Sequence, residues 1–132
     1  MKELNLEVTT PSKTAFSGQI KSVTVPGSKG NFQILFNHAP IMSALDIGVI
    51  KITGLDDKKT MFAISGGTVE VSNNKIIILA ETFEAPEDID LERANSAKLR
   101  AEERLKDHSQ MIDHVRAQAA LTRAINRIRL LS

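Results

Sequence analysis

Several residue types are missing or scarce in this chain of 132 residues. It has no cysteine, which excludes a disulfide framework, a thiolate zinc site, an iron–sulfur cluster and a cysteine nucleophile. It has no tryptophan or tyrosine and only five phenylalanines. No apolar run approaches the ~18–20 residues that a membrane-spanning helix needs. The length also excludes a large barrel or doubly wound enzyme, and the absence of a signal-like N-terminus predicts a cytoplasmic protein.

The scarce residues are unevenly distributed along the chain. Residues 1–85 contain all seven glycines and all five phenylalanines but no arginine, whereas residues 86–132 contain all seven arginines and neither glycine nor an aromatic residue. The net charge of +1 therefore hides two unlike segments. Such a break in composition, with Pro86 at the boundary, predicts two domains, a sheet domain at 1–85 and a helical domain at 86–132.

Residues 1–85 alternate between apolar and polar positions with a period of two, as half-buried strands do. Turn-forming segments such as Thr10-Pro11-Ser12-Lys13, Ser65-Gly66-Gly67 and Asn73-Asn74 separate the strands about every ten residues. This pattern predicts an antiparallel β-sandwich or flattened barrel of about ten short strands. Residues 76–80, which are apolar throughout, predict a strand without a solvated side. The alternating apolar positions are Leu4, Leu6, Val8, Val23, Val25, Phe32, Ile34, Phe36, Ile50, Ile52, Phe62, Ile64, Val69 and Val71.

Residues 86–132 have helical periodicity. Pro86 suits the start of a helix, and the acidic residues that follow favour one helix over roughly 88–105. Asp107 and Gln110 form a plausible capping pair for a second helix that runs to about Leu131. The short connection predicts an antiparallel hairpin. Its seam is expected to be rich in alanine and to bury little area, which favours a movable element; the seam residues are Ala94, Ala97, Ala101, Ala117, Ala120 and Ala124.

Arginine stripes are the main chemical feature of the helical segment. Arg93, Arg100 and Arg104 share one stripe of the first predicted helix, and Arg116, Arg123 and Arg127 share one of the second. Guanidinium groups bind carboxylate or phosphate, so an acidic helix, a nucleoside triphosphate and nucleic acid are all candidate partners. The alternative interpretation is that these arginines are solvated and pair on the helix surface with Glu92, Glu102, Glu103 and Asp113.

Motifs for catalysis are nearly absent, so an enzyme is the less favoured class. Residues 27–30 lack the spacing of a P-loop, and Ser65-Gly66-Gly67 lacks the strand-to-helix context of a nucleophile elbow. The three histidines, His38, His108 and His114, have no zinc-ligand spacing.

The whole chain resembles the epsilon subunit of bacterial F-type ATP synthase. The motifs that carry this resemblance are Thr10-Pro11, Asn37-His38-Ala39-Pro40-Ile41 (close to the family's Gly-His-Ala-Pro-Leu loop), residues 62–71, residues 87–90 and residues 121–127. The resemblance implies a non-catalytic subunit of the central stalk, peripheral on the cytoplasmic face of the cell membrane. Its sandwich would bind the gamma subunit and the c-ring, with His38 in a partner contact.

The resemblance also implies regulation by the helical hairpin. An extended hairpin would reach the catalytic beta subunit and inhibit ATP hydrolysis, whereas a compact hairpin would bind ATP without hydrolysing it and without a required metal. The ATP-binding signature I-D-x-x-R-A stands here at residues 89–94. The positions that match the family's ATP-binding residues are Glu84, Ile89, Asp90, Arg93, Ala94, Arg100, Arg123 and Arg127.

The competing hypothesis is a sandwich adaptor whose hairpin binds an acidic protein or nucleic acid. The helical segment has nine basic and eight acidic residues, so it lacks the basic excess of a nucleic-acid binder. It also has no aromatic side chain to stack on bases.

Overall fold

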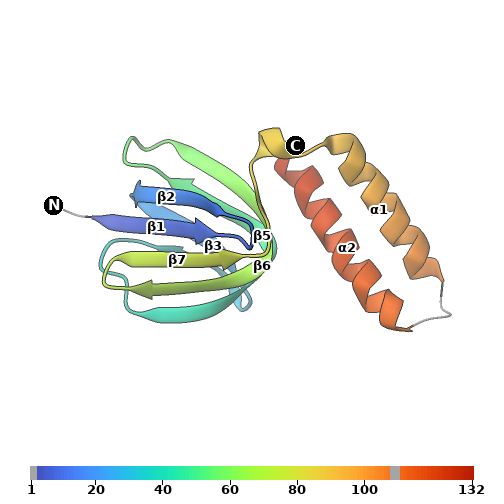
Figure 1. Cartoon of the computed structure of the whole chain (residues 1–132), viewed down its shortest axis with the longest axis horizontal. Coiled ribbons are helices and arrows are strands. Elements are labelled where there is room, and N and C mark those ends of the chain that lie inside the picture. Colours follow the sequence, from blue (N-terminus) through green and yellow to red (C-terminus); the bar gives the residue numbers. More distant parts are fainter. Residues whose placement is uncertain (1–2, 108–110) are drawn as a thin grey trace. The chain divides into compact units, whose positions relative to one another are not determined.

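A computed structural model describes residues 3–107 and 111–132. The chain divides into two compact units, Met1–Glu84 and Ala85–Ser132. The first is a β-sandwich and the second contains two helices, as Figure 1 shows. The predicted class, an N-terminal sandwich followed by a helical hairpin, is confirmed.

Eight strands form one hydrogen-bonded sheet in the order β2-β1-β7-β6-β5-β3-β4, with β8 paired to β6. Their bounds are β1 Leu4–Thr9, β2 Thr14–Ile20, β3 Ser22–Gly27, β4 Gly30–Ile34, β5 Ile41–Thr53, β6 Lys59–Ser72, β7 Lys75–Ala80 and β8 Phe83–Glu84. All pairs are antiparallel except β1 with β7, which is parallel. Because the sheet folds over on itself, the inward side chains of all the longer strands share one hydrophobic core.

The sheet bends where β5 and β6 pair, at Asp46 and Gly66. Before the bend the buried residues of β6 include Ile64, and after it they are the odd-numbered Val69 and Val71. Gly66 and Gly67 have positive φ angles of 105° and 153°, which permit the bend while the pairing of β5 with β6 continues. The prediction that Ser65-Gly66-Gly67 separates two strands was therefore wrong, and the sandwich has eight described strands, two of them long, instead of about ten short ones.

Strand β7 has an inward and an outward face, which corrects the prediction of a strand without a solvated side. Ile76, Ile78 and Ala80 are buried, but the side chain of Leu79 is 54% exposed. The alternation follows from the pairing of β7 between β1 and β6, which turns every second side chain away from the core. An apolar run in this strand therefore places one large apolar side chain on the surface.

The turns at the ends of the strands follow the predicted chemistry. Thr10 and Lys13 exchange two backbone hydrogen bonds of 2.9 and 3.3 Å. The β5–β6 turn is tied to the residue before β3 by an ion pair in which Lys21 Nζ lies 2.6 Å from Asp57 Oδ1. The hydrogen bond and charge of Lys21 lower the pKa of the Asp57 carboxyl below its ordinary value.

The helical unit begins with a short 3₁₀ helix, Pro86–Asp88, followed by α1 at Leu91–Lys106 and α2 at Met111–Leu130. The first α-helix therefore starts three residues later than the predicted 88, because Ile89 and Asp90 are extended and the Asp90 side chain caps the helix. Asp107 ends α1, and its N–H donates to Arg104 O at 3.1 Å. The predicted capping partner, Gln110, lies outside the described residues.

The two helices pack side by side as an antiparallel pair. Four alanines at the seam are buried, namely Ala94, Ala101, Ala117 and Ala124, and the predicted seam residues Ala97 and Ala120 are half-buried. Large apolar side chains such as Leu99 and Val115 are instead exposed. The seam therefore buries little apolar area per residue, and small side chains let the two backbones approach closely.

Candidate functional site

Six arginines, three from each helix, face the same side of the hairpin. On α1, Arg93 and Arg100 each stand one residue before a buried seam alanine, and on α2, Arg116 and Arg123 do the same. One residue corresponds to about 100° of rotation around a helix. In an antiparallel pair of right-handed helices, residues that precede a seam position by the same number of residues lie on the same side of the pair. We call this side the arginine face; it also includes Arg104 and Arg127, each three residues after a seam alanine.

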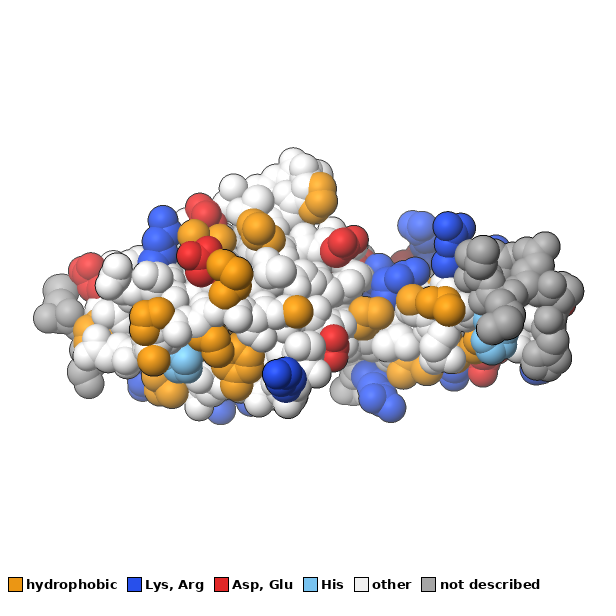
Figure 2. Space-filling model, turned by 90° about the horizontal axis from the view of Figure 1, so that it is seen from below, with side chains coloured by type: hydrophobic (Ala, Val, Ile, Leu, Met, Phe, Trp, Pro, Cys, Tyr) orange, Lys and Arg blue, Asp and Glu red, His pale blue; other side chains and the backbone are white. Residues whose placement is uncertain are grey.

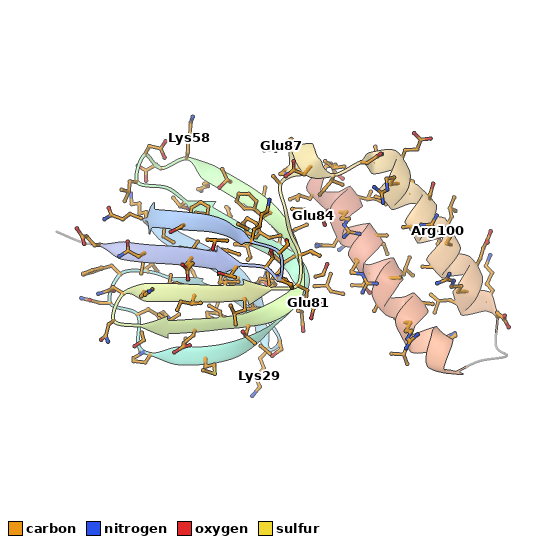
Figure 3. The ribbon with its side chains drawn as sticks, viewed as in Figure 1. Lys29, Lys58, Glu81, Glu84, Glu87 and Arg100 are labelled. Atoms are coloured by element: carbon orange, nitrogen blue, oxygen red, sulfur yellow. The ribbon has the colours of Figure 1, made fainter. Side chains whose placement is uncertain are left out.

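The spacing of the seam alanines places three of these arginines near one end of the hairpin. Ala94 and Ala101 are seven residues apart, as are Ala117 and Ala124, so in an antiparallel pair the first alanine lies level with the last. Arg93, Arg123 and Arg127 then lie near the start of α1, and Arg100 follows about two turns along the same helix. Arg116 lies within about one turn of the level of Arg100, and Arg104 lies nearer the other end. Figure 3 labels Arg100 on α1, and Figure 2 shows Lys and Arg side chains at the hairpin surface.

The expected surface ion pairs with the three glutamates of α1 are absent from the described part of the chain. Among the described residues, no carboxylate of Glu92, Glu102 or Glu103 lies within 4.0 Å of an arginine nitrogen; the Asp113 side chain lies outside the description. Arg93, Arg100 and Arg104 are exposed on α1, whereas Arg123 and Arg127 are half-buried on α2. The interpretation that these arginines pair with carboxylates on the helix surface is therefore not supported for the three glutamates.

Asp90 has a structural role at the start of α1. Its Oδ1 accepts a hydrogen bond from Arg93 N at 3.2 Å, so it is the N-cap of the helix. The carboxylate does not form an ion pair with the Arg93 guanidinium, and its exposed side chain has a second oxygen. Asp90 can therefore cap the helix and still accept a hydrogen bond from a ligand.

The backbone N–H groups of Ile89 and Ala94 are already used within the chain. Ile89 N donates to Pro86 O at 3.1 Å, and Ala94 N donates to Asp90 O at 3.0 Å. The Ala94 side chain is buried in the seam, while Ile89 is half-buried. A nucleobase bound at the start of α1 would therefore contact the Ile89 side chain and the Asp90 carboxylate. It would also meet the first-turn N–H groups of α1, which lack partners within the helix.

The remaining two predicted site residues belong to the sandwich. Glu84 is half-buried in β8, where it pairs with Ala63 of β6, while the other seven predicted ATP-binding residues belong to the helical unit. His38 is half-buried in the loop after β4. The strand β4 ends at Ile34, so Phe36 lies in a turn and not in the predicted strand.

The loop that carries His38 is tied to the β6–β7 turn. Asn37 N donates to Asn74 Oδ1 at 2.6 Å, and Asn74 Nδ2 donates to Asn37 Oδ1 at 3.1 Å. The sequence predicts a turn at Asn74, but nothing in its pattern connects this residue with His38. The two asparagines are 37 residues apart, and only the sheet topology brings them together.

The chemistry of the arginine face favours an anion with several oxygens. Guanidinium groups from two helices can each donate two hydrogen bonds to phosphate or carboxylate oxygens. Among residues 3–107 and 111–132, no group of three or more potential ligands from histidine and carboxylate side chains is placed to hold a metal ion. Within the same described ranges, neither helix is long and apolar enough to cross a membrane.

Comparison with known proteins accounts for both units. Residues 3–86 match the family described as "ATP synthase, Delta/Epsilon chain, beta-sandwich domain". Residues 87–132 match the family described as "ATP synthase, Delta/Epsilon chain, long alpha-helix domain". The two matches together span nearly the entire chain and follow the order of the two units.

Individual proteins show the same relationship. The chain is 46% identical over 129 residues to the ATP synthase epsilon chain of Nitratidesulfovibrio vulgaris strain DP4, covering 98% of this chain and 96% of the relative. It is 44% identical over 128 residues to that of Desulforamulus reducens, covering 97% and 96%.

Two solved structures share the fold. One is a chain of the Euglena gracilis mitochondrial ATP synthase structure "OSCP/F1/c-ring in rotational state 1", with a TM-score of 0.89 and 19% identity. The match covers 100% of the present chain and 83% of the Euglena chain. A chain of the Tetrahymena thermophila mitochondrial ATP synthase "central stalk/cring" has a TM-score of 0.69 at 14% identity and is covered to 98%. Because both family matches and the curated relatives agree over almost the full length, the chain belongs to the delta/epsilon chain family of ATP synthase and is an epsilon subunit.

Proposed function

We propose that the chain is a non-catalytic subunit of the central stalk of F-type ATP synthase, peripheral on the cytoplasmic face of the bacterial cell membrane. Its sandwich docks the gamma subunit and the c-ring and couples them mechanically. The observation that carries the proposal is the match of both units to the family over residues 3–86 and 87–132. The two similar structures are of an F1/c-ring assembly and of a central stalk with c-ring, which supports the same place in the complex.

The surface around His38 is the proposed contact of the sandwich with the gamma subunit. Leu35 is 50% exposed and Met42 is 74% exposed, on either side of the His38 loop. Figure 2 shows orange side chains around the pale blue histidine of the sandwich. Exposed apolar side chains grouped at one place favour a protein contact.

The helical hairpin is the proposed regulatory element. Its alanine seam buries small side chains, while Leu99 and Val115 remain exposed. A helix pair with so little buried apolar area gains modest stability from its own packing, so contacts with another surface can change its arrangement. We propose that the hairpin inhibits ATP hydrolysis when it is extended toward the catalytic beta subunit.

ATP is the proposed ligand of the compact hairpin, bound but not hydrolysed. Arg93, Arg100, Arg123 and Arg127 of the arginine face would hold the phosphates, and the second oxygen of Asp90 would accept a hydrogen bond from the exocyclic amine of adenine. The family resemblance adds Glu84, which belongs to the sandwich unit, as a further predicted ligand residue. No P-loop and no evident base for activating water accompany these residues, so binding without hydrolysis is expected, and no metal is required.

Competition between two anions would link ATP binding to inhibition. The arginines that hold ATP in the compact hairpin would meet an acidic segment of the catalytic subunit in the extended one. ATP would then shift the equilibrium only by its higher affinity for the compact form.

Removing residues 86–132 tests the regulatory role. We expect the reconstituted complex to hydrolyse ATP several-fold faster with residues 1–85 than with the full chain, because the inhibitory element is absent. The measurement is the steady-state ATPase rate of complexes shown to contain either form in equal amount. Equal rates would remove the inhibitory role, and failure of both forms to join the complex would contradict the stalk role.

Asp90→Asn tests the adenine contact. Asparagine is as good an N-cap as aspartate, so α1 is retained, but its amide NH₂ cannot accept a hydrogen bond from the adenine amine. We expect calorimetry of the full chain to show ATP bound more tightly than GTP, and the variant to lose about tenfold in ATP affinity. Absence of heat with ATP, or equal affinities for ATP and GTP in the wild-type chain, would contradict the proposed site.

A further inference from the structure

The loop between β4 and β5 makes a turn that needs a left-handed residue. Leu35 O accepts a hydrogen bond from His38 N at 3.2 Å, and Asn37, the third residue of this turn, has φ 65°. A positive φ at this position is typical of a type II turn, where glycine or asparagine is preferred. Asparagine, unlike glycine, also supplies a side chain that can form hydrogen bonds.

The β6–β7 turn supplies the partner of that side chain. Asn73 and Asn74 have φ angles of 50° and 60°, as a two-residue type I′ hairpin turn requires. The Asn74 carbonyl accepts from Asn5 N at 3.0 Å, which fixes the turn to β1. The Asn74 side chain is left to exchange the 2.6 and 3.1 Å hydrogen bonds with Asn37.

We propose that Asn37 and Asn74 form a latch that holds the His38 loop in the conformation that docks the gamma subunit. The inference rests on the proposed function, which assigns the surface around His38 to that contact. Asn74 is thus a positioning residue, which acts on the partner through the loop. Its two hydrogen bonds join the His38 loop to the β6–β7 turn, which is itself bonded to β1 through Asn5 N.

The latch affects binding through preorganisation. Leu35 and Met42 lie at the two ends of the loop segment and present apolar side chains to solvent. If the loop were free to move, docking would have to order it, and the lost conformational freedom would weaken the complex. A loop that is already held in the free protein avoids that cost, so breaking the latch lowers affinity even though no contact with the partner is removed.

Asn74→Gly removes the latch and preserves the turn. Glycine adopts a φ of 60° readily, and an Asn-Gly pair is favoured in a type I′ turn, so the hairpin is retained. Asn73→Gly is the matched control, because Asn73 also has a positive φ and its side chain forms no hydrogen bond among the described residues. The two variants differ only in which side chain is lost from the same turn.

Two measurements on the full chain separate the latch from its role in docking. Hydrogen exchange of the Asn37 amide, which donates to Asn74 Oδ1, reports the latch itself. We expect that amide to exchange about tenfold faster in Asn74→Gly, and the affinity for the purified gamma subunit to fall by about 2- to 10-fold. Asn73→Gly is expected to change neither quantity.

Three other outcomes would contradict the latch, its positioning role or the docking surface, respectively. Unchanged exchange of the Asn37 amide in Asn74→Gly overturns the latch. Faster exchange with unchanged affinity overturns the positioning role. Leu35→Ala and His38→Ala test the contact directly: if both bind the gamma subunit as tightly as the wild-type chain, the docking surface lies elsewhere and the proposed contact at His38 fails, whatever the exchange experiment shows.

Discussion

Gly67→Ala is expected to destabilise the sandwich by more than ~3 kcal/mol, a large part of the about 5–15 kcal/mol that stabilises a typical domain. A Cβ at this position would overlap the carbonyl oxygen of Leu79 and approach Ala80 Cα at 3.0 Å. These atoms belong to the backbone of β7, which pairs with β6 and cannot move without breaking that ladder. The φ of 153° adds strain for any residue with a side chain. Urea unfolding followed by circular dichroism measures the change.

Gly18→Ala is the matched control for this prediction. Gly18 is also in a strand, β2, but a Cβ built there has no atom within 4 Å apart from its neighbours in the chain. Its replacement is expected to change the free energy of unfolding by less than about 1 kcal/mol. Equal midpoints for the two variants would contradict the role of Gly67 at the bend.

A strand was predictable from the sequence where every second side chain points into the core along its whole length. Leu4, Leu6 and Val8 alternate with polar residues and all three are buried, because β1 keeps one face on the core throughout. The bend in β6 was not predictable from the same pattern. A Gly-Gly pair between two alternating runs is typical of a turn, and only the continued pairing with β5 distinguishes a bend within one strand from a turn between two.

The candidate site was predictable in its residue types and less so in their local roles. The 3.6-residue period places the arginines in stripes, and the positions of the buried alanines then assign both stripes to one side of the hairpin. The period does not show that Asp90 caps α1 or that the Ile89 and Ala94 N–H groups are used, since these depend on where the helix begins. The contact of Asn37 with Asn74 depends on topology and has no signal in the spacing of the sequence.

Arg123→Ala is expected to weaken ATP binding by about 10- to 100-fold. Arg123 is half-buried on α2, one residue before the buried Ala124, and belongs to the arginine face near the start of α1. A hydrogen bond to a charged group contributes about 1.5–3 kcal/mol, which corresponds to this range of affinity. The affected interaction is made with the phosphates and not with the base, so ATP and GTP are expected to lose affinity by similar factors. Isothermal calorimetry of the full chain measures both ligands.

Arg129→Ala is the control that separates position from charge. Arg129 is an exposed arginine of the same helix, five residues after Ala124, so it points away from the arginine face. Both variants lower the charge of the hairpin by one, but only Arg123→Ala is expected to reduce ATP affinity substantially. If the two variants lose affinity equally, general attraction between a basic helix and a triphosphate explains the binding, and the arginine face has no special role. If only Arg123→Ala loses ATP affinity, the anion is held by positioned guanidinium groups. We expect this result because the described glutamates of α1 form no ion pair with an arginine and because the arginines of the arginine face share one side of the hairpin.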